Sequence, residues 1–252
     1  MNNNEKGNSD NDNDIHELFL KIHKYSDCEL NNFDYKRVIR KDKRGYCGYY
    51  ISLIGTKHLL FFSFIHSFDY NSHILKIYLF FFNFTVTFTV NALFFNDETL
   101  HKKYKEKNSY DLIFNLPQIL YSTLISGFIN GLIGILAMTN TYIINLKQET
   151  KTKDINKLKE KIIRIIKIKF LLFFIINLIL LVLFWFYLAC FCAVYKNTQI
   201  HLIKDALISF GTSMIYPFGI YLIPGILRIR ALNAVKKDKK FMYDRSKALQ
   251  LL

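Results

Sequence analysis

The sequence predicts an all-α polytopic membrane helix bundle, with four spanning helices and one re-entrant or interfacial helix. Four uncharged, apolar stretches are long enough to cross a bilayer, and basic segments separate them. The hydrocarbon core of a bilayer is about 30 Å thick, so a helix that rises about 1.5 Å per residue needs roughly 20 apolar residues to cross it. The composition agrees, with 51% hydrophobic residues and 24 Phe in a chain of 252 residues. The predicted spans are residues 75–96, 114–140, 169–195 and 205–227.

The segment before the first span is polar and then basic. Residues 1–14 are rich in Asn and Asp and carry too little apolar surface to fold, so we expect disorder there. Residues 15–45 are predicted to be a cytosolic segment, in which apolar residues from Ile15 to Ile22 follow helical spacing ahead of a basic cluster. No cleavable signal peptide is visible, so the first span is expected to direct its own insertion.

Residues 49–66 are apolar enough to enter a membrane, but Lys57 and His58 fall in their middle. A charge at the centre of a span costs about 2.5–3.5 kcal/mol on the insertion scale. The apolar remainder after His58 is too short to cross a bilayer alone. We therefore predict a half-inserted helix here and not a fifth span.

The distribution of Lys and Arg supports four spans. With four spans, both termini lie on one side of the membrane, and most cations of the connecting segments share that side. Because Lys and Arg favour the cytosolic side, both termini are predicted to be cytosolic, in a membrane that the sequence does not identify. A fifth span would divide the cations nearly evenly. The cations left on the far side are Lys102, Lys103, Lys105, Lys107, Lys196 and Lys204.

The segment between the second and third spans combines helical spacing with many lysines. No Gly or Pro interrupts it from about residue 151 into the third span, which predicts one long helix ending near Tyr195. Its basic part and the basic cytosolic tail, residues 229–252, are expected to bind anionic lipid headgroups, which attract Lys and Arg. The predicted headgroup contacts are Lys151, Lys153, Lys157, Lys159, Lys161, Arg228, Arg230, Lys236 and Lys237.

Small residues recur at four-residue spacing in the second span. Such rows let helix backbones approach closely in lipid. We favour packing inside the four-helix set, and the alternative is dimerisation. The predicted helix-packing residues are Ser122, Thr123, Ser126, Gly127, Gly131 and Gly134.

The last span contains Pro217, Gly219, Pro224 and Gly225, which predict a kink or break near residues 216–219. A structural kink is the favoured interpretation, because kinks are common in membrane helices. The alternative is a transporter site, since broken helices often line such sites. That alternative predicts a polar cavity lined by Ser209, Thr212, Ser213 and Tyr216.

The sequence indicates neither an enzyme nor a metal or cofactor site. No nucleophile–base pair, phosphate-binding loop or dinucleotide motif appears, and Cys190 and Cys192 point to different faces of one helix. The formal net charge of +14 is explained by cations beside apolar spans, so nucleic acid is not an expected partner. No Asp, Glu, Lys or Arg lies inside the four apolar cores, residues 77–96, 112–146, 170–195 and 206–227, which argues against proton- or ion-coupled transport.

Several strings resemble a family of membrane proteins. VNALFFNDETLHKKY (residues 90–104), LPQILYSTLIS (116–126), FCAVYKNTQIHLIKDALISF (191–210) and YPFGIYLIPGILR (216–228) are similar to the C-terminal multi-pass region of large uncharacterised membrane proteins of ciliates and other protists. The resemblance covers roughly residues 69–252 and implies a membrane anchor, which in those proteins lies behind extracellular repeats. It carries over no activity and no catalytic residue. This chain begins with a short polar tail in place of repeats, so whether it is complete, a shortened relative or a fragment stays open.

The leading expectation is therefore a non-enzymatic membrane anchor or assembly domain. Its expected partners are the lipid bilayer, anionic lipid headgroups and other membrane helices. A channel or transporter subunit built around the broken last span is the alternative, and an enzyme acting on lipid is a distant third.

Overall fold

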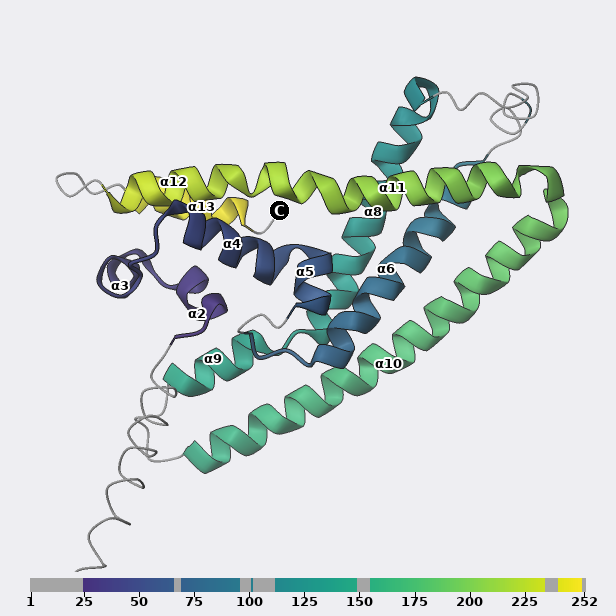
Figure 1. Ribbon diagram of the computed structural model, residues 1–252. Helices are drawn as coiled ribbons and strands as arrows, with labels where there is room; N and C mark the ends of the chain where they lie inside the picture. Colours follow the sequence, from purple (N-terminus) through teal and green to yellow (C-terminus); the bar gives the residue numbers. More distant parts are fainter. Residues whose placement is uncertain are drawn as a thin grey trace, which may run out of the picture.

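The computed structural model describes residues 25–65, 69–95, 101, 112–148, 155–233 and 240–250, and the elements it describes there are all helical (Figure 1). The disorder predicted for residues 1–14 and the helical spacing from Ile15 to Ile22 lie outside the described residues. The helices are α2 (Asp27–Asn32), α3 (Tyr35–Lys41), α4 (Tyr46–Lys57), α5 (Leu59–Phe64), α6 (His73–Leu93), α8 (Leu112–Ala137), α9 (Asn140–Gln148), α10 (Ile155–Val194), the short 3-10 helix η1 (Lys196–Thr198), α11 (Gln199–Ile220), α12 (Leu222–Leu232) and α13 (Lys240–Leu249).

Four helical segments are long and apolar enough to cross a membrane, as the sequence predicts. They are His73–Leu93, Asn115–Ala137, Asn156–Val194 and Lys196–Leu232, the last of which joins η1, α11 and α12. The four helical segments include most residues of the predicted spans. The third and fourth segments are longer than predicted, because they continue into the neighbouring basic segments. The described part of the chain is thus all-helical and contains four helices of the length and apolar composition that a membrane span needs.

Helix α6 lies at the centre of the bundle and packs against α5, α8, α10 and α11. One row of its side chains, including Phe82 and Val86, forms a core with Ile133 of α8 and Phe173 of α10. These positions are apolar at helical spacing, so each turn of α6 contributes one side chain to the core. A second core lies where α10 leads into α11, around Phe95, Phe191 and Leu202.

Helix α10 is a single helix of 40 residues, about 60 Å long. This confirms the predicted continuous helix from Ile155 onward. Most of its apolar side chains point away from the bundle, and Leu178 and Trp185 are 65% and 61% exposed. An apolar surface of this extent is stable when lipid or another membrane helix covers it.

The segment predicted as one half-inserted helix forms two helices, α4 and α5. The helical backbone is interrupted between them at His58. His58 has extended backbone angles (φ −71°, ψ 120°), and its ring lies against Phe61 and Phe218. The ring Nε2 lies 2.6 Å from the carbonyl oxygen of Met214 in α11. The break places His58 inside while Lys57 faces outward. Insertion of this segment into a membrane stays a prediction.

The last span is interrupted later than predicted. Helix α11 continues through Pro217, and the interruption falls at the single residue Tyr221, after which α12 continues in nearly the same direction (Figure 1). The interruption thus lies at Tyr221 and not within residues 216–219, while a kink at Pro217 stays a prediction. Pro224 lies in the first turn of α12, where a missing N–H costs little because that N–H has no partner within the helix.

Gly225 serves close packing between α12 and α4. A Cβ at this position would lie 2.8 Å from Cε2 of Tyr46, so a side chain must displace the ring. We expect Gly225→Ala to lower the free energy of unfolding by about 1–3 kcal/mol. Gly219→Ala is the matched control, because nothing lies within 4 Å of its Cβ position, and it should be neutral or stabilising by up to about 1 kcal/mol. Unfolding in mixed detergent micelles measures both variants, and equal effects would contradict the packing role.

The small residues of α8 divide between the interior and the surface. Ser122, Thr123 and Ser126 are buried, as the packing prediction requires. Gly127 and Gly131 are exposed, with no atom of another helix within 4 Å of their Cβ positions. Packing within this chain is therefore the wrong interpretation for these two glycines. Residues four apart drift by about 40° around a helix, so the row that begins inside at Thr123 turns outward by Gly131.

Candidate functional site: the cap and its basic surface

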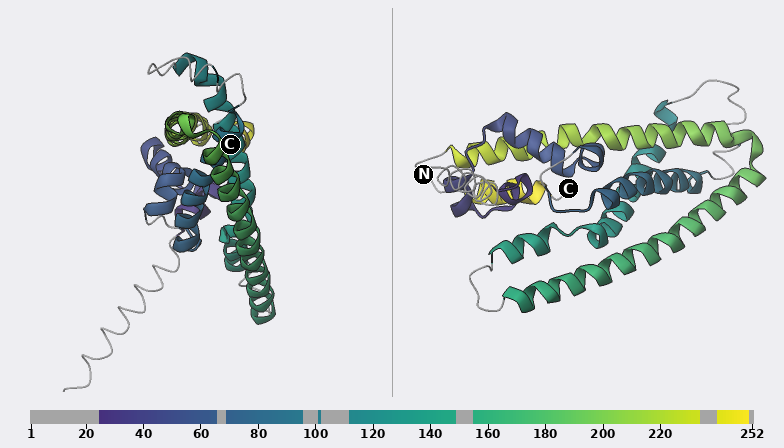
Figure 2. Two further views of the ribbon diagram at one scale, coloured as in Figure 1. Left: turned by 90° about the vertical axis from the view of Figure 1, so that its right-hand side faces the viewer. Right: turned by 60° about the horizontal axis from the view of Figure 1, so that its bottom comes forward.

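Helices α2, α3, α4, α12 and α13 pack together at one end of the molecule, and we call this unit the cap. It lies at the opposite end from the connection between α10 and α11 (Figure 2). Phe33 and Val38 from the first part of the chain form its core with Ala231 and Tyr243 from the last part. The fold thus brings the two ends of the described chain to the same end of the bundle.

The first cap helix is fixed by a capping box. The Ser26 hydroxyl accepts a hydrogen bond from the Glu29 amide at 3.3 Å, and the Glu29 carboxylate accepts one from the Ser26 amide at 2.8 Å. Such reciprocal bonds satisfy amides that a short helix leaves without partners. They position the last turn of α2, which carries Leu30 and Asn31, against the interior of the cap.

Arg228 of α12 lies at the centre of the cap with 0% of its surface exposed. Its Nη2 donates to Oδ2 of Asp42 at 2.8 Å and to the carbonyl oxygen of Leu30 at 2.7 Å. Its guanidinium also lies over the ring of Tyr49, 4.5 Å from the centroid. The prediction that Arg228 contacts lipid headgroups is wrong, because these partners hold the charge inside the protein.

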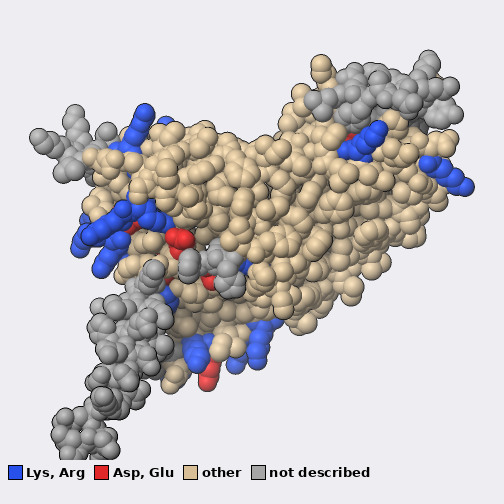
Figure 3. All heavy atoms as spheres, in the orientation of Figure 1, with Lys and Arg blue, Asp and Glu red and all other residues tan. Residues whose placement is uncertain are grey.

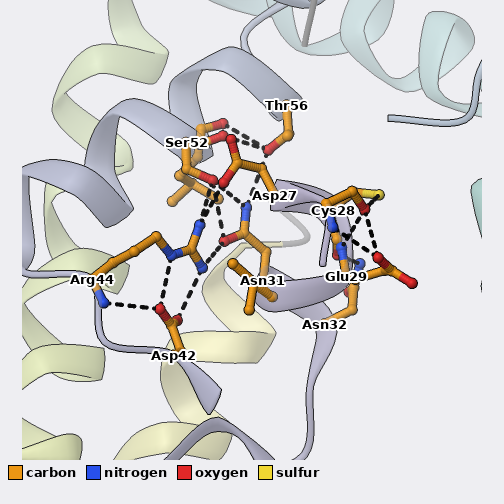
Figure 4. A network of polar contacts seen from close by, with 12 residues as sticks. Asp27, Cys28, Glu29, Asn31, Asn32, Asp42, Arg44, Ser52 and Thr56 are labelled. Atoms are coloured by element: carbon orange, nitrogen blue, oxygen red, sulfur yellow. Dashed lines mark hydrogen bonds and ion pairs between the residues drawn. The ribbon is translucent and has the colours of Figure 1, made fainter. Parts of the chain in front are cut away.

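Arg44 extends the network from Asp42 to α2 and α4 (Figure 4). Its Nε and Nη2 bind the two oxygens of Asp42 at 2.8 and 2.9 Å, which is the bidentate geometry that guanidinium groups favour. Its Nη1 donates to Asp27 at 3.0 Å and to the Ser52 hydroxyl at 2.8 Å. Two arginines and two aspartates therefore form one neutral, largely buried network between four helices of the cap.

Acid should destabilise the cap through Asp42. Burial raises the pKa of this carboxyl, but the hydrogen bonds from Arg44 and Arg228 outweigh burial and lower the pKa overall. A pKa below the unfolded value of about 3.9 adds stability that is present above about pH 4 and lost as the pH falls through the folded pKa.

We therefore expect a steady melting temperature from about pH 7 to about pH 5 and a fall below about pH 4. Asp42→Asn should show a lower melting temperature at neutral pH and a smaller fall in acid. Asp34→Asn, at an exposed position, is the control and should keep the wild-type profile. An acid response of wild-type size in Asp42→Asn would contradict the assignment.

A second buried ion pair lies where α6 begins. Lys76 Nζ lies 3.2 Å from Asp69, and both side chains are under 5% exposed. The same Nζ lies 4.8 Å from the centroid of the Phe62 ring in α5. Just beyond, the Tyr70 amide donates to Asn140 at 2.7 Å, and Lys147 of α9 contacts both Tyr70 and Glu29. These contacts tie the start of α6 to α9 and to the cap.

Exposed cations gather at the cap end and around the start of α10, and a broad band without charged side chains separates them from a smaller basic group at the other end (Figure 3). This pattern is typical of a protein whose middle lies in hydrocarbon and whose ends lie in headgroups and water. Among the residues that the structure describes, the exposed acids at the cap end are fewer, namely Asp34, Glu160 and Asp244. We use the term basic surface for the exposed cations at this end, which include Lys36, Arg40, Lys41, Lys43, Lys157, Lys159, Lys161, Arg164, Lys167, Arg230 and Arg245.

The predicted headgroup contacts therefore have different outcomes. Lys157, Lys159, Lys161 and Arg230 are exposed on the basic surface, and their contact with lipid stays a prediction. Arg228 is buried, as described above. The remaining four, Lys151, Lys153, Lys236 and Lys237, lie outside the described residues.

The residues predicted to line a transporter cavity occupy different environments. Ser209 is fully buried, and its hydroxyl lies 3.0 Å from that of Ser122. The Ser213 hydroxyl donates to the carbonyl of Phe210 in its own helix, and Tyr216 is 42% exposed. A cavity of about 380 Å³ lies beside the cap, where α2 and α3 face α9.

No family model matches the sequence, and neither a curated protein nor a solved structure is significantly similar to it. Among the described residues, no group of three or more His, Cys, Asp or Glu side chains is placed to hold a metal ion. The four cysteines are free thiols. The resemblance to protist multi-pass proteins stays a prediction.

Proposed function

We propose that the chain is a non-enzymatic membrane anchor or assembly domain whose basic surface binds anionic lipid headgroups. One observation carries the proposal. Helix α10 begins with exposed Lys157, Lys159 and Lys161 and continues without interruption into a long, exposed apolar surface. A helix of this kind binds headgroups with its basic turns while its apolar part lies in hydrocarbon.

The cap adds a second contribution to the same surface. Its neutral interior network fixes the relative positions of α3, α4 and α12, whose outer faces carry further exposed cations. Each Lys or Arg near an anionic leaflet contributes about 1 kcal/mol. Because positive residues favour the cytosolic side and the cytosolic leaflet is the anionic one, we place the cap there.

The proposal is tested by the lipid preference of the protein in a bilayer. Electron spin resonance with spin-labelled phosphatidylserine and phosphatidylcholine measures the ratio of the two lipids at the protein boundary. We expect the wild-type protein to favour phosphatidylserine, and this preference to weaken as salt screens the charges. Replacing Lys157, Lys159 and Lys161 by Gln in one variant should lower the ratio by at least about fivefold, because the loss of a single contribution of roughly 1 kcal/mol already predicts that factor.

Glu160→Gln is the matched control, since it removes an acid from the same turn of α10 and should raise the ratio. A phosphatidylserine preference that is the same in the triple variant and the wild-type protein would contradict lipid binding by this helix.

A further inference from the structure

A pocket of about 340 Å³ lies in the cap, where α13 faces the C-terminal ends of α2 and α4. Its volume falls in the range of small-molecule sites, about 300–1,000 Å³. We call it the α13 pocket, to distinguish it from the cavity beside α9. The residues that line it are Asn32, Lys57, Asp244, Lys247, Ala248 and Gln250.

Opposite charges line the α13 pocket without pairing. Among the described residues, neither the Lys57 ammonium group nor the Asp244 carboxylate has a hydrogen bond or an ion pair. Asp244 and Lys247 have a spacing on α13 that commonly brings opposite charges together. Lys247 instead donates to the carbonyl oxygens of Asn32 and Phe33 at 2.8 and 3.3 Å. The pocket therefore keeps two positive groups and one negative group apart from one another.

A buried amide in the α13 pocket also has no partner. Gln250 lines the pocket but is only 4% exposed, and its Nε2 has no hydrogen-bond partner among the described residues. A buried donor without a partner costs about 1–3 kcal/mol. The Asn32 amide group, in contrast, already donates to the carbonyl oxygen of Cys28 at 2.8 Å. Gln250 is therefore the neutral donor that an oxygen of a ligand would satisfy.

The surroundings of Lys57 favour an anion at the edge of a membrane. The side chain is exposed overall, yet protein atoms beside its ammonium group desolvate that group and lower the pKa of Lys57, against a smaller opposing effect from Cys28. An anion next to the ammonium group would stabilise its charged form. Helix α5 follows directly and packs against the candidate span α6, and its Leu60 and Phe64 are 39% and 48% exposed. Apolar surface that acyl chains can cover thus begins beside the pocket.

We propose that the α13 pocket binds the headgroup of a phosphatidylserine-type lipid, which carries a phosphate, a carboxylate and an ammonium group. Lys57 and Lys247 bind the two anionic groups, Asp244 accepts hydrogen bonds from the ammonium group, and Gln250 donates to an anionic oxygen. A headgroup without an ammonium group would leave Asp244 unpaired, and a headgroup without the carboxylate would leave one lysine unpaired.

The proposed function requires only that exposed lysines of α10 attract negative charge, whereas this pocket recognises one headgroup by its ammonium group. The pocket uses none of those three lysines, so either proposal can fail alone.

Calorimetric titration of the protein in an uncharged detergent tests the pocket. The probes are the short-chain lipids dihexanoyl phosphatidyl-L-serine and dihexanoyl phosphatidylglycerol, which have the same net charge. We expect saturable binding of the serine lipid that is at least about tenfold tighter, because phosphatidylglycerol has no ammonium group for Asp244. Glycerophospho-L-serine, which has the same headgroup without acyl chains, should bind more weakly. Binding of this soluble compound as tight as that of the lipid would assign the pocket to a soluble ligand and overturn the proposal.

Variants of the lining residues separate the pocket from general attraction by the basic surface. Asp244→Asn should abolish the preference for the serine lipid over phosphatidylglycerol, and Lys57→Gln should weaken serine-lipid binding at least about tenfold. Lys43→Gln, at an exposed lysine of the cap outside the pocket, is the matched control and should keep the preference.

The triple Gln variant of α10 should also keep the preference, which separates a failure of this proposal from a failure of the proposed function. Equal binding of the two lipids by the wild-type protein would overturn the proposal, as would a preference that survives in Asp244→Asn.

Discussion

Replacing Arg228 with methionine should lower the free energy of unfolding by about 3–5 kcal/mol, which is typical when one partner of a buried ion pair is removed. Methionine keeps much of the length of the side chain but removes the guanidinium. The change leaves the Leu30 carbonyl without its donor at 2.7 Å and leaves Asp42 with Arg44 as its one remaining arginine partner in the network. Equilibrium unfolding in mixed micelles, followed by circular dichroism, measures the loss.

Arg230→Met is the matched control, because Arg230 lies two residues further along α12 and is exposed. It should change the free energy of unfolding by no more than about 0.5 kcal/mol. Combining Arg228→Met with Asp42→Asn should cost less than the sum of the two single losses, because both variants remove the same contact between Arg228 and Asp42. Equal effects of Arg228→Met and Arg230→Met would show that the network does not stabilise the cap.

The second large effect is expected for Lys76→Met, also about 3–5 kcal/mol. The Asp69 side chain is under 5% exposed, and its carboxylate lies 3.2 Å from the Lys76 ammonium group. Lys76→Met removes this contact and leaves the carboxylate in its buried position. The double variant Lys76→Met with Asp69→Asn should recover most of the stability, since replacing both charges of a buried pair is often close to neutral.

Lys204→Met serves as the control for this pair, because Lys204 is an exposed lysine of α11. The same micelle titration should detect almost no change in it. If Lys76→Met were as stable as Lys204→Met, the buried ion pair would make no significant contribution to the free energy of unfolding.

The helical class and the spans could be predicted because both depend on properties that are local in sequence. Hydropathy over about 20 residues identifies a spanning helix, and the absence of Gly and Pro predicts the continuity of α10. The position of Arg228 could not be predicted in this way. Its carboxylate partner Asp42 lies 186 residues away in the chain, and a charge next to an apolar span normally faces headgroups.

The buried position of Asp205 was missed for a related reason. Asp205 lies at the boundary of an apolar core, where sequence alone does not distinguish a side chain that faces water from one that faces α6 and α8. The available signal was a shared polar periodicity, in which Asn83, Thr87 and Asn91 recur every four residues on α6 and Ser122 and Ser126 do so on α8. Two such rows in apolar helices indicate a polar contact between them.

The arrangement of four spanning helices with the cap on one side is the central claim, and cysteine labelling in sealed vesicles tests it most directly. The four native cysteines are first replaced, and single cysteines are then placed at exposed Lys43, at exposed Ala248 and at Lys196 near the connection between α10 and α11. We predict that a membrane-impermeant maleimide labels positions 43 and 248 from the same side and position 196 only from the other. Labelling of positions 43 and 248 from opposite sides, or of all three from one side, would contradict it.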